Sequence, residues 1–207
     1  MKRSELFVSM VFILSAVPAV FVSAQADVSL GDVGTYSVDA RTARITTLRE
    51  QYRIKLSDKE RELVVARCEP AQASLQKIAF RLNETRISRI STYDDVIGSL
   101  DTVRTLVVVK QIDPSNVELL TVEYQQKKAT FETTVSDYQT ALEDSIQVDC
   151  KTQPEDFRAA LEGVRSARKD VVSASSQIIE LTNSNLKTAF DTLKLKLGAN
   201  DGGTDGR

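Results

Sequence analysis

The chain has 207 residues, with 27 lysines and arginines against 29 aspartates and glutamates, so its net charge is −2. This balance argues against a nucleic-acid-binding protein, in which basic residues predominate and form a stripe or patch. The chain has only 8 glycines and 4 prolines, and aromatic residues make up 6% of it. This composition favours long helices over a turn-rich β fold.

Residues 1–26 have the pattern of a bacterial signal peptide. Lys2 and Arg3 precede an apolar run at 6–22, and small residues then stand at cleavage spacing, ending at Ala24 or Ala26. The alternative is an uncleaved anchor, because an apolar run of this length is at the lower limit of a membrane span. Pro18 and the small residues favour cleavage. We therefore expect an exported protein, periplasmic, cell-surface or secreted, with no integral membrane span after signal cleavage.

Residues 27–38 show no helical period and predict a flexible lead-in. From residue 41 to residue 56, apolar residues recur at steps of three and four, which predicts a first, shorter helix; they are Ile45, Leu48, Tyr52 and Leu56. Ser57 and Glu60 form the S-x-x-E pattern of a capping box, so we expect a helix to restart there.

The longest predicted helix runs from about residue 70 to residue 110. Its apolar stripe alternates steps of three and four, as in a coiled coil or a bundle helix. The stripe consists of Leu75, Ile78, Leu82, Ile87, Ile90, Tyr93, Ile97, Leu100, Val103 and Val107. The β-branched run at 106–109 is expected to pack where this helix meets the next.

Two prolines mark the starts of the following helices. Asp113 and Pro114 predict a helix over 114–148, with Ser115 and Glu118 as a second capping box. A third box, Thr152 with Glu155, predicts the start of the last helix, with Pro154 in its first turn. The middle of this helix, residues 173–185, is rich in residues that weaken helices, so we expect fraying or a kink there.

Short connections make neighbouring helices antiparallel. The sequence therefore predicts an all-α protein, an elongated antiparallel bundle or coiled coil of three long helices plus a shorter N-terminal helix. The predicted organisation is a signal peptide at 1–26, a lead-in at 27–38, a helical bundle domain at 39–197 and a disordered tail at 198–207.

Enzymatic chemistry finds little support in the sequence. Histidine is absent, which removes the commonest general base and zinc ligand, and no glycine-rich phosphate loop occurs. Carboxylates stand in adjacent pairs, 94–95, 143–144 and 155–156, whose members diverge by about 100° on a helix. We expect these pairs to lie on solvated faces or at helix N-termini. No catalytic, cofactor-binding or metal-binding residue and no cofactor are predicted.

The two cysteines, Cys68 and Cys150, are the only candidate site. Two thiols without histidine make a poor zinc site, and no C-x-x-C redox motif is present. In an exported protein two cysteines usually pair. Two helical arms that fold back near Asp113 bring both cysteines to the same end. We therefore predict a disulfide between Cys68 and Cys150.

With these residues in view, the sequence resembles an uncharacterised family of small exported helical proteins of candidate-phylum bacteria with reduced genomes. The likeness covers about residues 61–172. It is carried by Arg67-Cys68-Glu69, the helix that follows up to Tyr93, Asp113-Pro114-Ser115 before Leu119, Val148-Asp149-Cys150, and Phe157-Arg158-Ala159-Ala160-Leu161 with Arg165. The resemblance implies helical architecture and export, and it implies no active site.

The leading hypothesis is a non-enzymatic structural or protein-interaction module of the cell envelope. Its partner would be another, unknown protein, and self-association through coiled-coil faces is possible. The alternative is a periplasmic holdase-type chaperone with helical arms, although the basic character of such chaperones is missing. A bundle that senses a small ligand is a third hypothesis, and it requires a cavity between helices.

Overall fold

The computed structural model describes residues 38–201, and these form helices joined by short connections. The described residues contain no strand, which confirms the all-α prediction. The predicted signal peptide and residues 27–37 of the predicted lead-in lie outside the described residues. Residues 202–207 of the predicted tail also lie outside them.

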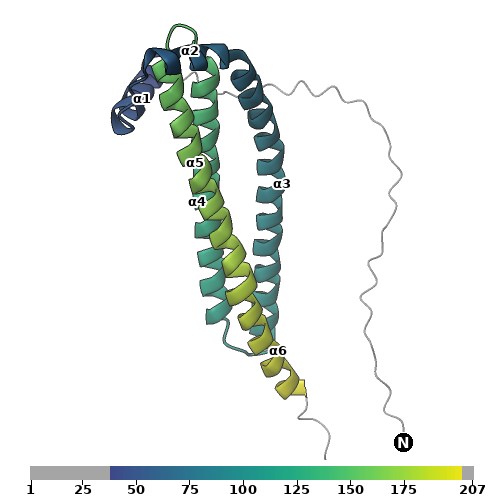
Figure 1. The fold of residues 1–207 in the computed structure, drawn as a ribbon. Coiled ribbons are helices and arrows are strands. Elements are labelled where there is room, and N and C mark those ends of the chain that lie inside the picture. The colour runs from purple at the N-terminus through teal and green to yellow at the C-terminus, as the bar shows by residue number, and fades with distance from the viewer. Residues whose placement is uncertain (1–37, 202–207) are drawn as a thin grey trace, which may run out of the picture. The chain divides into compact units, whose positions relative to one another are not determined.

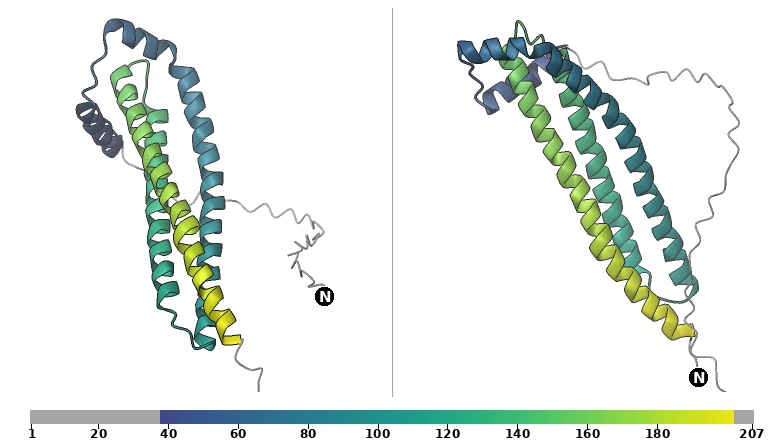
Figure 2. Two further views of the ribbon diagram at one scale, coloured as in Figure 1. Left: turned by 60° about the horizontal axis from the view of Figure 1, so that its bottom comes forward. Right: turned by 45° about the vertical axis from the view of Figure 1, so that its right-hand side comes forward.

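Three long helical segments lie side by side: α3, α4, and the run of α5, η1 and α6 (Figures 1 and 2). Two short helices, α1 and α2, lie near the end at which α3 begins. The helix bounds are α1 Val38–Gln51, α2 Asp58–Ala66, α3 Cys68–Val109, α4 Ser115–Gln147, α5 Pro154–Glu180, η1 Leu181–Leu186 and α6 Lys187–Asp201. The helix expected over 41–56 thus begins and ends earlier, and α6 includes residues 198–201, which were predicted to belong to the tail.

The buried apolar residues form two clusters along these helices. One cluster joins α3, α4 and the α5–α6 run, and in it the Tyr93 ring meets the rings of Tyr124 and Phe131 edge to face, with centroids 6.2 and 5.3 Å away. The second cluster surrounds the cysteines. Its buried members are Ile45, Cys68, Leu75, Tyr138, Leu142, Val148, Cys150, Phe157, Ala160 and Val164.

The predicted stripe of α3 is only partly buried. Leu75, Leu100 and Val107 are buried as expected. Ile78 and Ile87 are exposed, because α3 packs mainly against α4 and buries one narrow face. Ile87, for example, points about 140° away from Leu82 around the helix, at 3.6 residues per turn.

The predicted packing of the run 106–109 is wrong for three of its four residues. Val107 is fully buried, but the side chains of Leu106, Val108 and Val109 are exposed. A single helical turn points its residues in all directions, so one neighbouring helix covers only one of the four.

One of the three predicted capping boxes is present. Glu60 accepts a hydrogen bond from the backbone N–H of Ser57 at 2.8 Å, and α2 begins at the next residue. At the start of α4, Ser115 instead donates to Asp113 through its backbone N–H and its hydroxyl, at 3.0 and 2.6 Å. Glu118 lies 3.7 Å from Arg104.

The third box is absent because α5 begins at Pro154, two residues after Thr152. The Thr152 hydroxyl donates to Asp149 at 2.8 Å, and Glu155 forms an ion pair with Arg61 at 2.5 Å. A capping box needs its two residues at the N-cap and at the third helical position, so a shift of the helix start removes it.

Two helices end at residues with a left-handed backbone that are not glycine. Arg53 follows α1 with φ of 50°, and Gln111 follows α3 with φ of 56°. At the end of α3, the Ile112 N–H donates to the Val107 carbonyl at 2.8 Å and the Gln111 N–H donates to the Val108 carbonyl at 3.0 Å. This is the Schellman arrangement, and the buried Ile112 and Val107 supply the apolar contact that accompanies it.

The weak stretch predicted in the last helix is a π-helical segment, η1. In a π-helix each backbone hydrogen bond spans five residues, whereas in an α-helix it spans four. Leu181 and Leu186 are five residues apart and are both buried, whereas Asn185 is exposed. The wider turn therefore places Leu186 in the core where a regular α-helix would place Asn185.

Candidate functional site: the two-cysteine end of α3 and α4

Cys68 and Cys150 lie at disulfide distance in the structure, with their Cα atoms 5.7 Å apart. Cys68 is the first residue of α3, and Cys150 lies in the turn after α4. Both are buried, with 3% and 0% of their surface exposed. The beginning of α3 and the end of α4 are thereby linked at one point, across 82 positions of the sequence.

A glutamine beside the cysteines binds the end of α4. The Gln72 side-chain amide donates hydrogen bonds to the carbonyl oxygens of Ile146 and Val148, at 3.0 and 2.8 Å. Carbonyl groups at a helix C-terminus lack partners within the helix, so this amide satisfies two acceptors that would otherwise need water. Sequence reasoning did not identify Gln72, because its partners lie more than 70 residues away.

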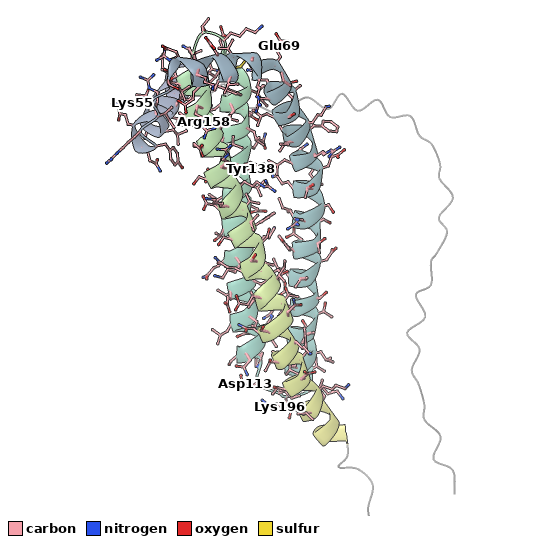
Figure 3. All side chains as sticks on the ribbon, viewed as in Figure 1. Lys55, Glu69, Asp113, Tyr138, Arg158 and Lys196 are labelled. Atoms are coloured by element: carbon pink, nitrogen blue, oxygen red, sulfur yellow. A yellow bond between two sulfur atoms is a disulfide. The ribbon has the colours of Figure 1, made fainter. Side chains whose placement is uncertain are left out.

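An ion pair joins the two residues that follow the cysteines in the sequence. Lys151 lies 2.6 Å from Glu69, and their contact lowers the pKa of Glu69 and raises the pKa of Lys151. Both side chains are well exposed, so water screens the pair and its contribution to stability is small. Figure 3 shows Glu69 at this end of the molecule, where α3 begins.

Asp149 organises the turn that contains Cys150. Its carboxylate accepts hydrogen bonds from the Thr152 hydroxyl at 2.8 Å and from the Lys151 backbone N–H at 3.0 Å. These bonds favour the ionised carboxylate and lower the pKa of Asp149. The turn is therefore fixed by a side chain that is itself exposed.

Helix α1 packs beside this end through arginine side chains. Arg44 binds Asp144 of α4 with two hydrogen bonds, of 2.8 and 2.7 Å, and Arg41 donates to Gln147. Arg49 pairs with Asp156 of α5 at 2.9 Å. Helix α1 thus contacts the end of α4 and the start of α5 through the side chains of three arginines.

The prediction that the adjacent carboxylates lie on solvated faces or at helix N-termini is wrong for Asp144, whereas Glu155 and Asp156 lie in the first turn of α5 as predicted. Asp144 is only 6% exposed, and its charge is balanced by Arg44. Glu155 and Asp156 bind Arg61 and Arg49 respectively, so they link α5 to α2 and α1. A signal for these pairs was present, since arginines recur along α1, but the sequence does not show which distant carboxylate each would meet.

The described residues contain no group of three or more cysteine, aspartate or glutamate side chains placed to hold a metal ion. Within residues 38–201, no helix has the length and hydropathy needed to cross a membrane. Both cysteines are buried, and the disulfide between them joins the start of α3 to the turn after α4.

Comparison of the chain with models of known protein families, with curated proteins and with solved structures finds no match.

Proposed function

We propose that this protein is an exported, non-enzymatic helical module of the bacterial cell envelope that binds another protein. In this proposal α3, α4 and the α5–α6 run form an elongated antiparallel bundle or coiled coil, and the linked cysteines hold it together in an oxidising compartment. The signal-peptide pattern and the resemblance to small exported helical proteins support export. The absence of histidine supports a binding role over catalysis.

The observation that carries the binding role is a set of exposed apolar side chains on both sides of the α3–α4 turn. We call this set the turn surface. It consists of Leu106, Val108 and Val109 of α3 and Leu119 and Val122 of α4, which are between 46 and 73% exposed. Exposed apolar side chains that gather in one region mark protein-interaction sites more often than isolated ones do.

The turn surface lies at the opposite end of α3 from the cysteines. Asp113, in the turn, and Lys196, in α6, lie together at this end in Figure 3. Hydrogen bonds from Ser115 lower the pKa of Asp113, and the charge of Lys196 adds to this to a lesser extent. The end with the covalent link and the end with exposed apolar residues are therefore separated by the length of α3. This separation supports a role in stability for the end that holds the cysteines and a role in binding another protein for the turn surface.

A photocrosslinking experiment in the native cell tests the binding role. A photoreactive amino acid is placed at Val108 in one variant and at Val172 of α5 in a second, because these valines are similarly exposed, at 53 and 57%. We expect a discrete crosslinked product with another protein from position 108 and none from position 172. A product with the mass of two chains would indicate self-association instead, and equal or absent products at both positions would contradict the proposal.

Export is tested separately. The N-terminus of the protein purified from the extracytoplasmic fraction is determined by mass spectrometry, and cleavage is expected after Ala24 or Ala26. The same sample is treated with a thiol-alkylating reagent under denaturing conditions. Neither Cys68 nor Cys150 should react before reduction, and both should react after it. An intact N-terminus at Met1 would favour the anchor, and reactive thiols would contradict an oxidised pair.

The second candidate function is a holdase for unfolded outer-membrane proteins. Apolar side chains at the far end of long helices favour it, because such ends can cover apolar segments of a client. The test is suppression of aggregation of an unfolded β-barrel protein. Activity at stoichiometric protein that is lost when Val108 and Val109 are replaced by serine would support a holdase, and no suppression would exclude it.

A further inference from the structure

A pocket of about 390 Å³ lies where α2 and the start of α3 meet α5. Its apolar lining is supplied by six side chains, those of Leu56, Leu63, Val64, Ala71, Phe157 and Leu161. Pockets that bind small molecules are typically about 300–1,000 Å³ and are lined mainly by apolar and aromatic groups. This pocket has the size and the lining of a site for a small apolar or amphiphilic ligand.

Helix α2, which forms one wall of the pocket, is weakly packed. None of its residues is buried, and Leu63 is 49% exposed. An ion pair between Arg61 and Glu155 connects α2 to α5, and the arginine is half exposed. A ligand that covers accessible apolar side chains in a pocket removes apolar surface from water, and this favours binding.

The charged groups around the pocket are two arginines and one glutamate: Arg67, Arg158 and Glu60. Glu60 is held ionised, because hydrogen bonds from Ser57 lower its pKa. Arg158, seen on α5 in Figure 3, pairs with Glu162 at 2.9 Å. Among the residues that the structure describes, no carboxylate lies within ion-pair distance of Arg67. The pocket therefore offers an apolar surface with two arginines against one glutamate, and Arg67 is the arginine that forms no ion pair among the described residues.

We propose that this pocket binds a monoanionic amphiphile, a long-chain carboxylate whose apolar chain lies against the pocket wall and whose carboxylate binds Arg67. A guanidinium binds a carboxylate with two parallel hydrogen bonds, so Arg67 suits this head group. Arg67 precedes Cys68, so the link between the cysteines fixes the backbone beside the binding arginine. The site is independent of the turn surface and lies at the other end of α3.

Three probes distinguish the parts of the ligand in a calorimetric titration of the full exported chain. Dodecanoate carries both the chain and the anion, dodecyltrimethylammonium carries the same chain with a cation, and acetate carries the anion alone. All three are used below the concentration at which they form micelles. We expect saturable binding of one dodecanoate per chain, and neither saturable binding of the cationic probe nor measurable binding of acetate.

Two pairs of variants locate the binding. Arg67→Ala should weaken dodecanoate binding at least about tenfold, which corresponds to one charge-assisted contact, and Arg67→Lys should restore part of it. Arg81→Ala, which changes an exposed arginine elsewhere on α3, should leave the affinity unchanged. Leu63→Glu should abolish binding, whereas Ile179→Glu, at an isoleucine of α5 that is 53% exposed and belongs to neither surface, should have no effect.

Circular dichroism confirms that each variant is folded before the titration. Equal binding of dodecanoate and dodecyltrimethylammonium, or an unchanged affinity in both Arg67→Ala and Leu63→Glu, would overturn the assignment. No binding of dodecanoate to the unmodified chain would also overturn it. Because the variants leave the turn surface intact, crosslinking from Val108 should persist in them, so failure of this proposal is separable from failure of the binding role.

Discussion

At the scale of single residues, Gln111 adopts a backbone conformation that costs a residue with a Cβ atom free energy. A left-handed conformation costs an L-residue about 1–2 kcal/mol, and glycine adopts it without that cost. The chain reverses direction at Gln111, before the proline from which the sequence predicted the turn. The sequence does not indicate that the chain turns at Gln111, because a glutamine stands where a glycine usually marks such a helix end.

Replacing Gln111 by glycine should therefore stabilise the protein by about 1 kcal/mol, since the relief of the left-handed strain exceeds the extra entropy of glycine in the unfolded chain. Urea denaturation measures the change. The matched control is Gln76→Gly in the exposed interior of α3, which should destabilise by about 1 kcal/mol. Equal destabilisation by both substitutions would show that Gln111 is not strained.

Asp149 predicts how the turn at Cys150 responds to acid. Its pKa lies below the ordinary value of 3.8, so its contribution to stability is present above that pH and is lost as the pH falls through the lowered pKa. We expect the melting temperature of the protein to fall below about pH 4. Asp149→Asn, which cannot be protonated, should show a shallower fall over the same range. Parallel curves for both proteins would contradict the role of Asp149.

At the scale of helices, apolar periodicity predicted the long helices and much of the buried stripe of α3, including Leu75, Leu100 and Val107. Periodicity shows which residues share a face, but it does not show how wide a face the neighbouring helix covers. Ile78 and Ile87 were therefore assigned to the core and are exposed. The contacts of α1 with α4 were missed for a related reason, because Arg44 and Asp144 are 100 residues apart and carry no local pattern.

Arg44 should matter more for the attachment of α1 than Arg49 does. Arg44→Ala leaves the buried Asp144 without its bidentate partner, which should destabilise the protein by about 2 kcal/mol. Arg49→Ala removes a more exposed pair and should cost less than about 1 kcal/mol. Denaturation of both variants gives the comparison, and similar losses would mean that Asp144 is compensated by water.

The π-helical segment η1 predicts that one residue can be deleted there with little loss of stability. Deletion of the exposed Ser184 should convert the wide turn into a regular α-helical turn and leave Leu181 and Leu186 four residues apart, still on one face. We expect the melting temperature to fall by less than about 5 °C. Deletion of the exposed Thr130 in α4 should instead rotate every later residue of that helix by about 100°. The buried stripe would then no longer face its neighbours, so the cooperative unfolding transition should be lost. If both deletions are equally harmful, the π-turn does not accommodate an extra residue.

At the scale of the whole molecule, the prediction concerns the covalent link. Closing a loop of 82 positions stabilises a protein by about 4–5 kcal/mol at most on the chain-entropy model. Reduction should therefore lower the melting temperature by about 10 °C. The double variant Cys68→Ser with Cys150→Ser should melt at the same lower temperature with or without reductant. A melting temperature that does not change on reduction would contradict a stabilising link.

The same link sets how far the protein can be stretched. A pull applied at the two ends of the chain passes directly from Cys68 to Cys150, so α3 and α4 carry no tension while the bond is intact. Reduction would release the 82 positions between them, which extend to roughly 270–300 Å at about 3.3–3.6 Å per residue. An oxidised molecule attached at both ends would thus act as a tether of limited reach.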